Sequence, residues 1–281
     1  MKALVTGGAG FVGSHLVETL LHGGHIVHVI DDLSTGKLEN LPPRYEEFYN
    51  EIPQRFVFIQ GDITKDETFD SLDSYDVIFH CAARASIPQS VEDPTGSNAQ
   101  NVGGTLKVLE YAKKKRSIVV FSSSSSVYGD TLILPSPEHQ YLNPLSPYAL
   151  QKQIGEQYLK LYNILYGVKC VALRYFNVFG DRQPDSDSYS VLISRFTKQK
   201  KENKPFTIFG TGKQKRDFVY VKDVVQANIL AASWAKDNEF GVFNIGYGEN
   251  ISVNEIADSM DKERPREYLP PRIEPMANLA D

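Results

Sequence analysis

The sequence has few cysteines, no long hydrophobic run and no excess of positive charge. Its two cysteines, Cys81 and Cys170, lie in apolar, strand-like runs, and we expect them to be reduced core residues rather than a disulfide. No apolar run is long enough to cross a bilayer, and Met1 leads directly into a strand without a signal peptide. The net charge of -5 gives no reason to expect nucleic-acid or anionic-membrane binding. These absences predict a cytoplasmic protein without nucleic-acid or membrane partners.

The rest of the composition is that of an ordinary globular protein, with 281 residues, 41% of them hydrophobic and 23% charged. Such a chain can bury one large core or two smaller ones. Short apolar strands alternate with helical stretches, which is typical of an α/β fold with a doubly wound parallel sheet. We expect strands at 2–6, 25–30, 55–60, 77–80, 117–121 and 168–173, and the main helices at 11–22, 98–115 and 148–166.

A glycine-rich turn separates the first expected strand from the first helix. It reads Gly8-x-Gly10-x-x-Gly13, and equally Gly7-x-x-Gly10-x-x-Gly13. Without Cβ atoms the backbone can approach a pyrophosphate at the helix N-terminus, so the pattern predicts dinucleotide binding. Asp31 ends the second strand, where a carboxylate bonds the adenosine ribose and repels a 2′-phosphate, which favours NAD over NADP. A plain glycine turn and a turn-forming Asp31 are the structural alternatives.

The alternating pattern ends after Arg174, where proline, glycine and polar residues crowd 181–188 and 201–213. We therefore predict a Rossmann-like NAD-binding domain over 1–175, to which 218–248 return. A smaller, discontinuous C-terminal substrate-binding domain would consist of 176–217 and 249–281.

Two downstream segments carry groups suited to redox chemistry. Residues 122–126 are all serine, and Tyr148 and Lys152 are four residues apart, which places them on one face of a helix. A phenol with a pKa near 10 is a poor base at neutral pH. A nearby ammonium and a positively charged nicotinamide ring would favour the phenolate. We expect Tyr148 to take a proton from an alcohol while hydride leaves the same carbon.

Together these motifs resemble those of the extended short-chain dehydrogenase/reductases. The resemblance is carried by the 6–13 turn, Asp62 after the third strand, Cys81-Ala82-Ala83 after the fourth, the serine run and Tyr148-x-x-x-Lys152. The segments 174–180 and 212–218 narrow it to the nucleotide-sugar branch, and to UDP-hexose 4-epimerases in particular. The resemblance implies a UDP-sugar substrate, a homodimer formed through the helices at 98–115 and 148–166, and no metal site.

The resemblance also implies roles for individual residues. Ser124 would be the catalytic hydroxyl, Tyr148 the acid/base, and Lys152 the residue that holds the nicotinamide ribose and lowers the pKa of Tyr148. The cofactor would be bound by Gly7, Gly10, Phe11, Val12, Gly13, Asp31, Asp32, Ser34, Thr35, Gly36, Asp62, Ile63, Cys81, Ala82, Ala83, Asn101, Ser122, Tyr148, Lys152 and Phe176.

The substrate residues follow from the same resemblance. Asn177, Arg216 and Arg272 would contact the diphosphate, for which guanidinium groups are well suited, and Glu274 would hold the nucleoside ribose. The uracil slot would be lined by Val191, Leu192, Thr207, Ile208 and Phe209. Arg84, Ser86, Ser124, Tyr148 and Asn278 complete the set of expected substrate contacts.

Ser125 and Ser126 discriminate between reactions in this branch. Nucleotide-sugar 4,6-dehydratases place Asp-Glu directly after the hydroxyl residue, and decarboxylases keep a Glu two residues after it. Since serine occupies both positions here, no carboxylate there supports a second acid/base step. The expected reaction is inversion at C4 of the sugar, in which hydride passes to NAD and returns to the other face of a 4-keto sugar. A dehydratase or decarboxylase, an oxidoreductase that releases NADH, and a non-catalytic NAD-binding module are the alternatives.

Two features bear on the identity of the sugar. Residues 84–90 resemble a segment of epimerases that favour N-acetylated sugars, and the gate position that is a tyrosine in strict glucose/galactose epimerases falls at Asn278. We expect UDP-GlcNAc/UDP-GalNAc as substrates, with UDP-Glc/UDP-Gal alongside. Members of the family continue past the position of Asp281 and have longer connections around 260–268. The sequence is therefore expected to be either truncated or missing internal residues.

Overall fold

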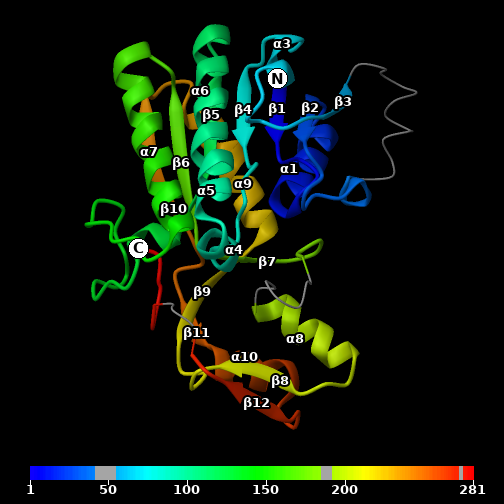
Figure 1. The fold of residues 1–281 in the computed structure, drawn as a ribbon, viewed down its shortest axis with the longest axis vertical. Helices are drawn as coiled ribbons and strands as arrows, with labels where there is room; N and C mark the ends of the chain where they lie inside the picture. The colour runs from blue at the N-terminus through cyan, green and yellow to red at the C-terminus, as the bar shows by residue number, and fades with distance from the viewer. Residues whose placement is uncertain (42–54, 185–191, 272–274) are drawn as a thin grey trace.

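The computed structural model describes residues 1–41, 55–184, 192–271 and 275–281. Within these ranges a seven-stranded sheet forms the centre of the larger part of the molecule (Figure 1). Its order is β10-β6-β5-β4-β1-β2-β3, and every neighbouring pair is parallel, which confirms the predicted doubly wound sheet. The strands are β1 (Lys2–Thr6), β2 (Ile26–Asp31), β3 (Phe56–Gln60), β4 (Val77–His80), β5 (Ile118–Ser124), β6 (Cys170–Tyr175) and β10 (Phe240–Ile245).

Helices cover both faces of this sheet. Successive strand residues point to opposite faces, so Ala3 and Val5 join one hydrophobic cluster while Leu4 joins the other. Two helices cover each cluster. The first is covered by α1 (Phe11–His22) and α9 (Val221–Trp234), and the second by α6 (Gly104–Lys115) and α7 (Pro147–Tyr166). Coverage on both sides explains why the central strands are nearly continuous apolar runs.

Helix α7 has clear capping residues at both ends. Ser146 Oγ accepts a hydrogen bond from the Ala149 amide at 3.2 Å, Pro147 occupies the first helical position, and Gly167 ends the helix with a φ of 67°. These residues fix Tyr148 in the first turn. A helix between parallel strands runs antiparallel to them, so this turn lies at the carboxyl edge of the sheet, where ligands bind in such folds.

The helix expected at 98–115 contains a π-helical turn near its start. A short helix α5 (Pro94–Asn98) is followed by a π-helical turn, η2 (Ala99–Gly103), before α6 begins. The expected helix is therefore confirmed, whereas the π-helical turn inside it was not predicted. Asp93 caps α5 through the Gly96 amide at 2.8 Å, and the wider turn that follows places Asn101 within hydrogen-bonding distance of a neighbouring loop.

The smaller part of the molecule lies beyond the carboxyl edge of the sheet (Figure 1). It has its own core, in which Phe196 stacks on Phe206 at 4.4 Å between ring centroids, with Ile208 and Ile256 beside them. Its elements are β7 (Asn177–Phe179), α8 (Leu192–Lys201), β8 (Phe206–Phe209), β9 (Lys215–Tyr220), β11 (Asn250–Ser252), α10 (Val253–Asp261) and β12 (Arg266–Leu269). Strands β11, β9 and β7 form one sheet, and β12 pairs with β8.

The remaining short helices are η1 (Leu38–Asn40), α3 (Glu67–Asp70), α4 (Ile87–Glu92) and η3 (Ser125–Tyr128). Strand β5 runs three residues past the expected end at 121, so Ser122, Ser123 and Ser124 belong to the strand. Among the helices of the described residues, none is long and apolar enough to pass through a bilayer.

Candidate active site

A first cleft lies where β1, β2 and β4 end. It is lined by Gly7, Gly10, Ile30, Asp31, Asp32, Ser34, Thr35, Gly61, Ile63, Cys81, Ala82, Ala83, Arg84 and Gln100. Gly7 has a φ of 71°, and a Cβ on it would lie 2.6 Å from the Ala82 amide nitrogen. A Cβ on Gly13 would lie 2.2 Å from the Gly7 carbonyl oxygen. The glycine-rich turn therefore packs closely both on itself and on the loop after β4, as only glycine allows.

Asp31 supplies a buried carboxylate at the edge of this cleft. Its two oxygens accept hydrogen bonds from the Ala9 and Leu33 amides, each at 2.9 Å. Burial raises the pKa of Asp31, and the two amide bonds oppose this rise. The carboxylate thus ties the glycine-rich turn to the end of β2, where the sequence predicts ribose binding.

A second cleft lies beside the ends of β5 and β6. Its predicted members are Phe11, Val12, Ser124, Tyr148, Phe176, Asn177, Arg216 and Asn278. The loop after β4 connects the two clefts, because residues 81–84 line the first while Ala85 and Ile87 line the second. The two clefts thus share one loop, and each receives residues from widely separated parts of the chain.

The serine, tyrosine and lysine of the predicted triad converge at this second cleft. Ser124 Oγ accepts a hydrogen bond from the Ser126 amide at 3.2 Å, so the proton of Ser124 remains free to be donated. Lys152 is buried just behind, with its Nζ 5.8 Å from the centre of the Tyr148 ring and donating to the Ser122 carbonyl at 2.7 Å. The structure therefore brings the three side chains together.

The pKa values of this pair shift with burial. Burial lowers the pKa of Lys152 to about 8, although Cys81 and Glu156 oppose the shift. Burial also raises the pKa of Tyr148 to about 12, against the hydrogen bond from Ser124. This rise is opposite in direction to the lowering expected from Lys152. In the protein alone, burial therefore favours the neutral phenol of Tyr148, and a further positive charge nearby would favour the phenolate.

A buried ion pair lies directly behind the serines. Glu156 accepts from Arg174 Nε at 2.9 Å and from Arg174 Nη2 at 2.7 Å, and Ser123 Oγ donates to the same carboxylate at 2.5 Å. Arg174 also donates to the Tyr128 hydroxyl at 2.9 Å. The ion pair therefore links α7 to β6. It also contacts Ser123, which precedes Ser124 in the chain, and Tyr128, which follows it.

Two residues expected to contact the diphosphate, Asn177 and Arg216, also line the second cleft. Asn177 Nδ2 donates to Asn278 Oδ1 at 3.1 Å and to the Asp217 carbonyl at 2.7 Å. Asn278 Oδ1 also accepts from the Asp217 amide at 2.9 Å. Arg216 is buried, and its Nη1 donates to the Lys215 carbonyl at 2.8 Å. The side chain of Asn278 is thus held by its neighbours.

Most of the other predicted residues do not line either cleft. Ser86 caps α4 through the Gln89 amide at 3.3 Å. Also absent from both linings are Gly13, Gly36, Asp62, Asn101, Ser122 and Lys152. Arg84, expected to contact the substrate, borders the first cleft and pairs with Asp93 at 3.0 Å. Leu192, Thr207, Ile208 and Phe209 belong to the smaller part, where Ile208 is completely buried in the core, so its side chain cannot face a ligand. Val191, Arg272 and Glu274 lie outside the described residues.

Some residues that line the second cleft were not predicted from the sequence. Tyr128 follows the serine run and Tyr175 immediately precedes Phe176, so both lie in segments that carried the prediction. Ser126 lies beside them, and its hydroxyl oxygen is buried with no hydrogen-bond partner among the described residues. Ser123 and Ser125 belong to the serine run, and Ala85, Ile87 and Val178 lie in segments that carry the resemblance. No sequence signal singles out the others, which are Gly129, Thr131, Ser136, Gln183, Pro275 and Ala277.

Comparisons with known proteins agree with this geometry. The family model described as "NAD dependent epimerase/dehydratase family" matches residues 3–246. A UDP-glucose 4-epimerase of Mycolicibacterium smegmatis is 38% identical over 281 residues, covering 97% of this chain and 87% of the relative. A UDP-N-acetyl-alpha-D-glucosaminuronate decarboxylase of Bacillus cytotoxicus is 33% identical over 92% of this chain and 79% of its own length.

A similar solved structure is the UDP-N-acetylglucosamine 4-epimerase from Methanobrevibacter ruminantium M1 in complex with UDP-N-acetylmuramic acid. It is 38% identical, with a TM-score of 0.91, and the match covers 100% of this chain and 89% of that one. The similarity in fold therefore extends over the entire chain.

Proposed function

The chain belongs to the NAD dependent epimerase/dehydratase family, and we propose that it inverts C4 of a UDP-sugar through a transient 4-keto sugar. The observation that carries the proposal is the second cleft. Ser124 and Tyr148 line it together with Asn177 and Arg216. A hydroxyl and a phenol that line the same cleft as an arginine and an amide suit a sugar alcohol attached to a diphosphate.

NAD is the cofactor, and the first cleft fits it. The turn at Gly7 and Gly10 leaves the α1 N-terminus open to a pyrophosphate, and Asp31 offers a carboxylate to the adenosine ribose. In this proposal Lys152 would hold the nicotinamide ribose, and its burial beside Tyr148 supports that role. When bound, NAD accepts a hydride from the sugar carbon and supplies a positive ring that would favour the Tyr148 phenolate.

The protein's own residues would handle the proton. Because the Ser124 oxygen already accepts the Ser126 amide, Ser124 can donate toward Tyr148 and relay a proton from the sugar hydroxyl. Tyr148 would take that proton as phenolate and return it after the keto sugar has turned. Asn177 and Arg216 would hold the diphosphate during this turn, and the apolar walls formed by Phe11, Val12 and Phe176 would limit access of water.

Elimination and decarboxylation require a further acid or base. Ser125 and Ser126 line the second cleft, and no Asp or Glu is among the described residues that line it. The second candidate function is decarboxylation of a UDP-sugar acid, because one relative bears that name. The serines disfavour it, since they supply no carboxylate at the position that such enzymes use.

The proposal is tested by incubating purified protein with UDP-GlcNAc or UDP-Glc without added NAD, while following products and NADH absorbance. We expect the C4 epimer to form without accumulation of NADH. Tyr148→Phe should abolish turnover while retaining NAD, whereas Tyr141→Phe, at a residue 87% exposed, should match the wild type. A dead-end keto product, a decarboxylated product or stoichiometric NADH would overturn the proposal.

The preferred sugars in this proposal are UDP-GlcNAc and UDP-GalNAc, with UDP-Glc and UDP-Gal alongside. Asn278 supports this choice of sugars. Its short side chain is hydrogen-bonded to Asn177 and to the Asp217 amide, which would leave space for a 2-acetamido group. Asn278→Tyr should reduce turnover of UDP-GlcNAc at least about tenfold relative to UDP-Glc, since a bulky ring would compete for that space. Turnover of UDP-Glc with none of UDP-GlcNAc by the wild type would refute this choice of sugar.

The proposal also includes the domain division, a homodimer and a cytoplasmic location. Leu161, Ile164 and Leu165 are exposed apolar side chains along α7, which supports a dimer contact there. Two free cysteines are typical of a reducing compartment. Sedimentation of the purified protein at several concentrations would check the dimer.

A further inference from the structure

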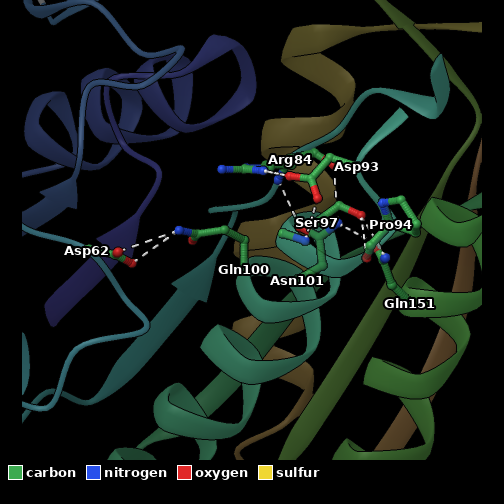
Figure 2. A network of polar contacts seen from close by, with 9 residues as sticks. Asp62, Arg84, Asp93, Pro94, Ser97, Gln100, Asn101 and Gln151 are labelled. Carbon is green, nitrogen blue, oxygen red and sulfur yellow. Dashed lines mark hydrogen bonds and ion pairs between the residues drawn. The ribbon is translucent and has the colours of Figure 1, made fainter. Parts of the chain in front are cut away.

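Gln151 lies on α7 between the catalytic residues Tyr148 and Lys152 but borders neither cleft. Its side chain is buried, with 3% of the residue exposed. Its Oε1 accepts a hydrogen bond from Asn101 Nδ2 at 2.7 Å, and its Nε2 donates to Ser97 Oγ at 2.9 Å. Helix α7, which carries Tyr148, is therefore hydrogen-bonded through Gln151 to α5 and to η2 (Figure 2).

Asn101 is in turn hydrogen-bonded to the loop after β4. Its Oδ1 accepts from the Arg84 amide at 2.8 Å, and its Nδ2 donates to the Arg84 carbonyl at 3.2 Å (Figure 2). One side-chain amide thus satisfies both backbone groups of Arg84. The preceding residues, Cys81 to Ala83, line the cofactor cleft, and Ala85 lines the second cleft. The loop's backbone is therefore fixed at the junction of the two clefts.

The direction of every hydrogen bond in this chain of contacts is determined. At one end Ser97 Oγ donates to the Pro94 carbonyl at 3.1 Å, and a carbonyl can only accept. At the other end the Arg84 amide can only donate. Between these ends, Gln151 must present its nitrogen to Ser97 and its oxygen to Asn101. A side chain at 151 that lacks either group would break the connection.

We propose that Gln151 is a positioning residue that, through Asn101, holds the loop of residues 81–85 in the conformation that binds NAD. The inference deepens the proposed function but depends only on the cofactor, not on which sugar reacts. Gln151 touches neither the reacting atoms nor the cofactor cleft, so its effect should appear in cofactor affinity and not in proton transfer.

The test is equilibrium dialysis of the full-length protein against a range of NAD concentrations, without sugar. Gln151→Met keeps the length of the side chain but loses both hydrogen bonds, and it should raise the NAD dissociation constant about tenfold. Gln157→Met, at an exposed residue of the same helix, is the matched control and should change nothing. At saturating NAD the variant's kcat and its pH profile should stay within about twofold of the wild type.

A double-mutant cycle separates positioning from a general loss of stability. If Gln151 acts through Asn101, Gln151→Met should change NAD affinity less than about twofold in an Asn101→Ala background. Ser97→Ala, which removes only one of the two contacts, should weaken NAD binding by about threefold and serves if Gln151→Met folds poorly. Unchanged NAD affinity in Gln151→Met, or effects that multiply fully in the double variant, would overturn the proposal. A wild type that binds NAD but converts no UDP-sugar would refute the proposed function and leave this inference standing.

Discussion

Glu156→Gln should strongly destabilise the protein although it removes a single charge. Glu156 and Arg174 are 3% and 4% exposed, and their side chains meet at 2.7 Å. Burial lowers the pKa of Arg174, and the hydrogen bond and charge of Glu156 raise it. A guanidinium keeps its proton in proteins even without such a partner, so Arg174 stays charged in the variant. The substitution would therefore leave a guanidinium in the interior without a counter-charge.

The magnitude follows from this burial. Breaking a buried ion pair from one side costs roughly 3–5 kcal/mol, which is a large share of the total of about 5–15 kcal/mol that stabilises most domains. Glu156→Gln keeps the shape of the side chain, so little of the loss would come from a cavity. The contact to Ser123 would also weaken, since that hydroxyl donates to the same carboxylate.

Urea unfolding followed by circular dichroism measures the effect. The control is Asp66→Asn, which breaks the exposed Lys107–Asp66 pair, whose side chains are 38% and 77% exposed, and should cost less than about 1 kcal/mol. Glu156→Gln/Arg174→Met should lose less than Glu156→Gln alone, because the uncompensated charge is gone. If Glu156→Gln loses no more free energy of unfolding than Asp66→Asn, this reasoning about the buried pair is incorrect.

Further predictions concern the glycine turn, Lys152 and Ser126. Gly13→Ala should yield protein with little bound NAD after gel filtration, because its Cβ would meet the Gly7 carbonyl, whereas Gly103→Ala, with no atom within 4 Å of the new Cβ, should retain it. Because burial lowers the pKa of Lys152 from 10.5 to about 8, the unfolded chain binds more protons between these values; this residue's contribution to the free energy of unfolding therefore rises with pH there. Lys152→Met should remove that rise in urea titrations at about pH 8 and 10, and an unchanged slope would contradict it. Ser126→Ala should keep the free energy of unfolding within about 0.5 kcal/mol in urea titrations, since its hydroxyl has no described partner to lose, and a larger loss would reveal one.

The parallel sheet could be predicted because local patterns specify it. Apolar runs, the glycine turn and the Ser146–Pro147 helix start act within a few residues, and the structure has strands and helices at those places. The π-helical turn at η2 could not be predicted in the same way. This turn allows Asn101 to accept a hydrogen bond from Arg84, which is 17 positions away in the sequence. The periodicity of a single segment cannot predict such a contact.

In the candidate site, too, short motifs could be predicted from the sequence, whereas properties that arise on folding could not. Ser124 and Tyr148 could be named because they lie in short motifs, and the structure places both in one cleft. The pKa of Tyr148 could not be inferred from its neighbour Lys152 alone, since burial, which only the folded chain determines, sets its direction. Gln151 lay inside the recognised motif without a predicted role, because its partners Ser97 and Asn101 become neighbours only on folding.

The position of β10 in the sheet limits how this protein can be divided for engineering. Strand β10 comes from residues 240–245, after most of the smaller part, yet it pairs along the whole of β6. A fragment that ends at residue 175 would leave β6 as an open edge and would expose the sheet face that α9 covers. Such a fragment would be prone to aggregate through that edge. The cofactor-binding half is therefore not a portable module, and exchanging substrate specificity between relatives calls for grafting internal segments rather than joining two halves.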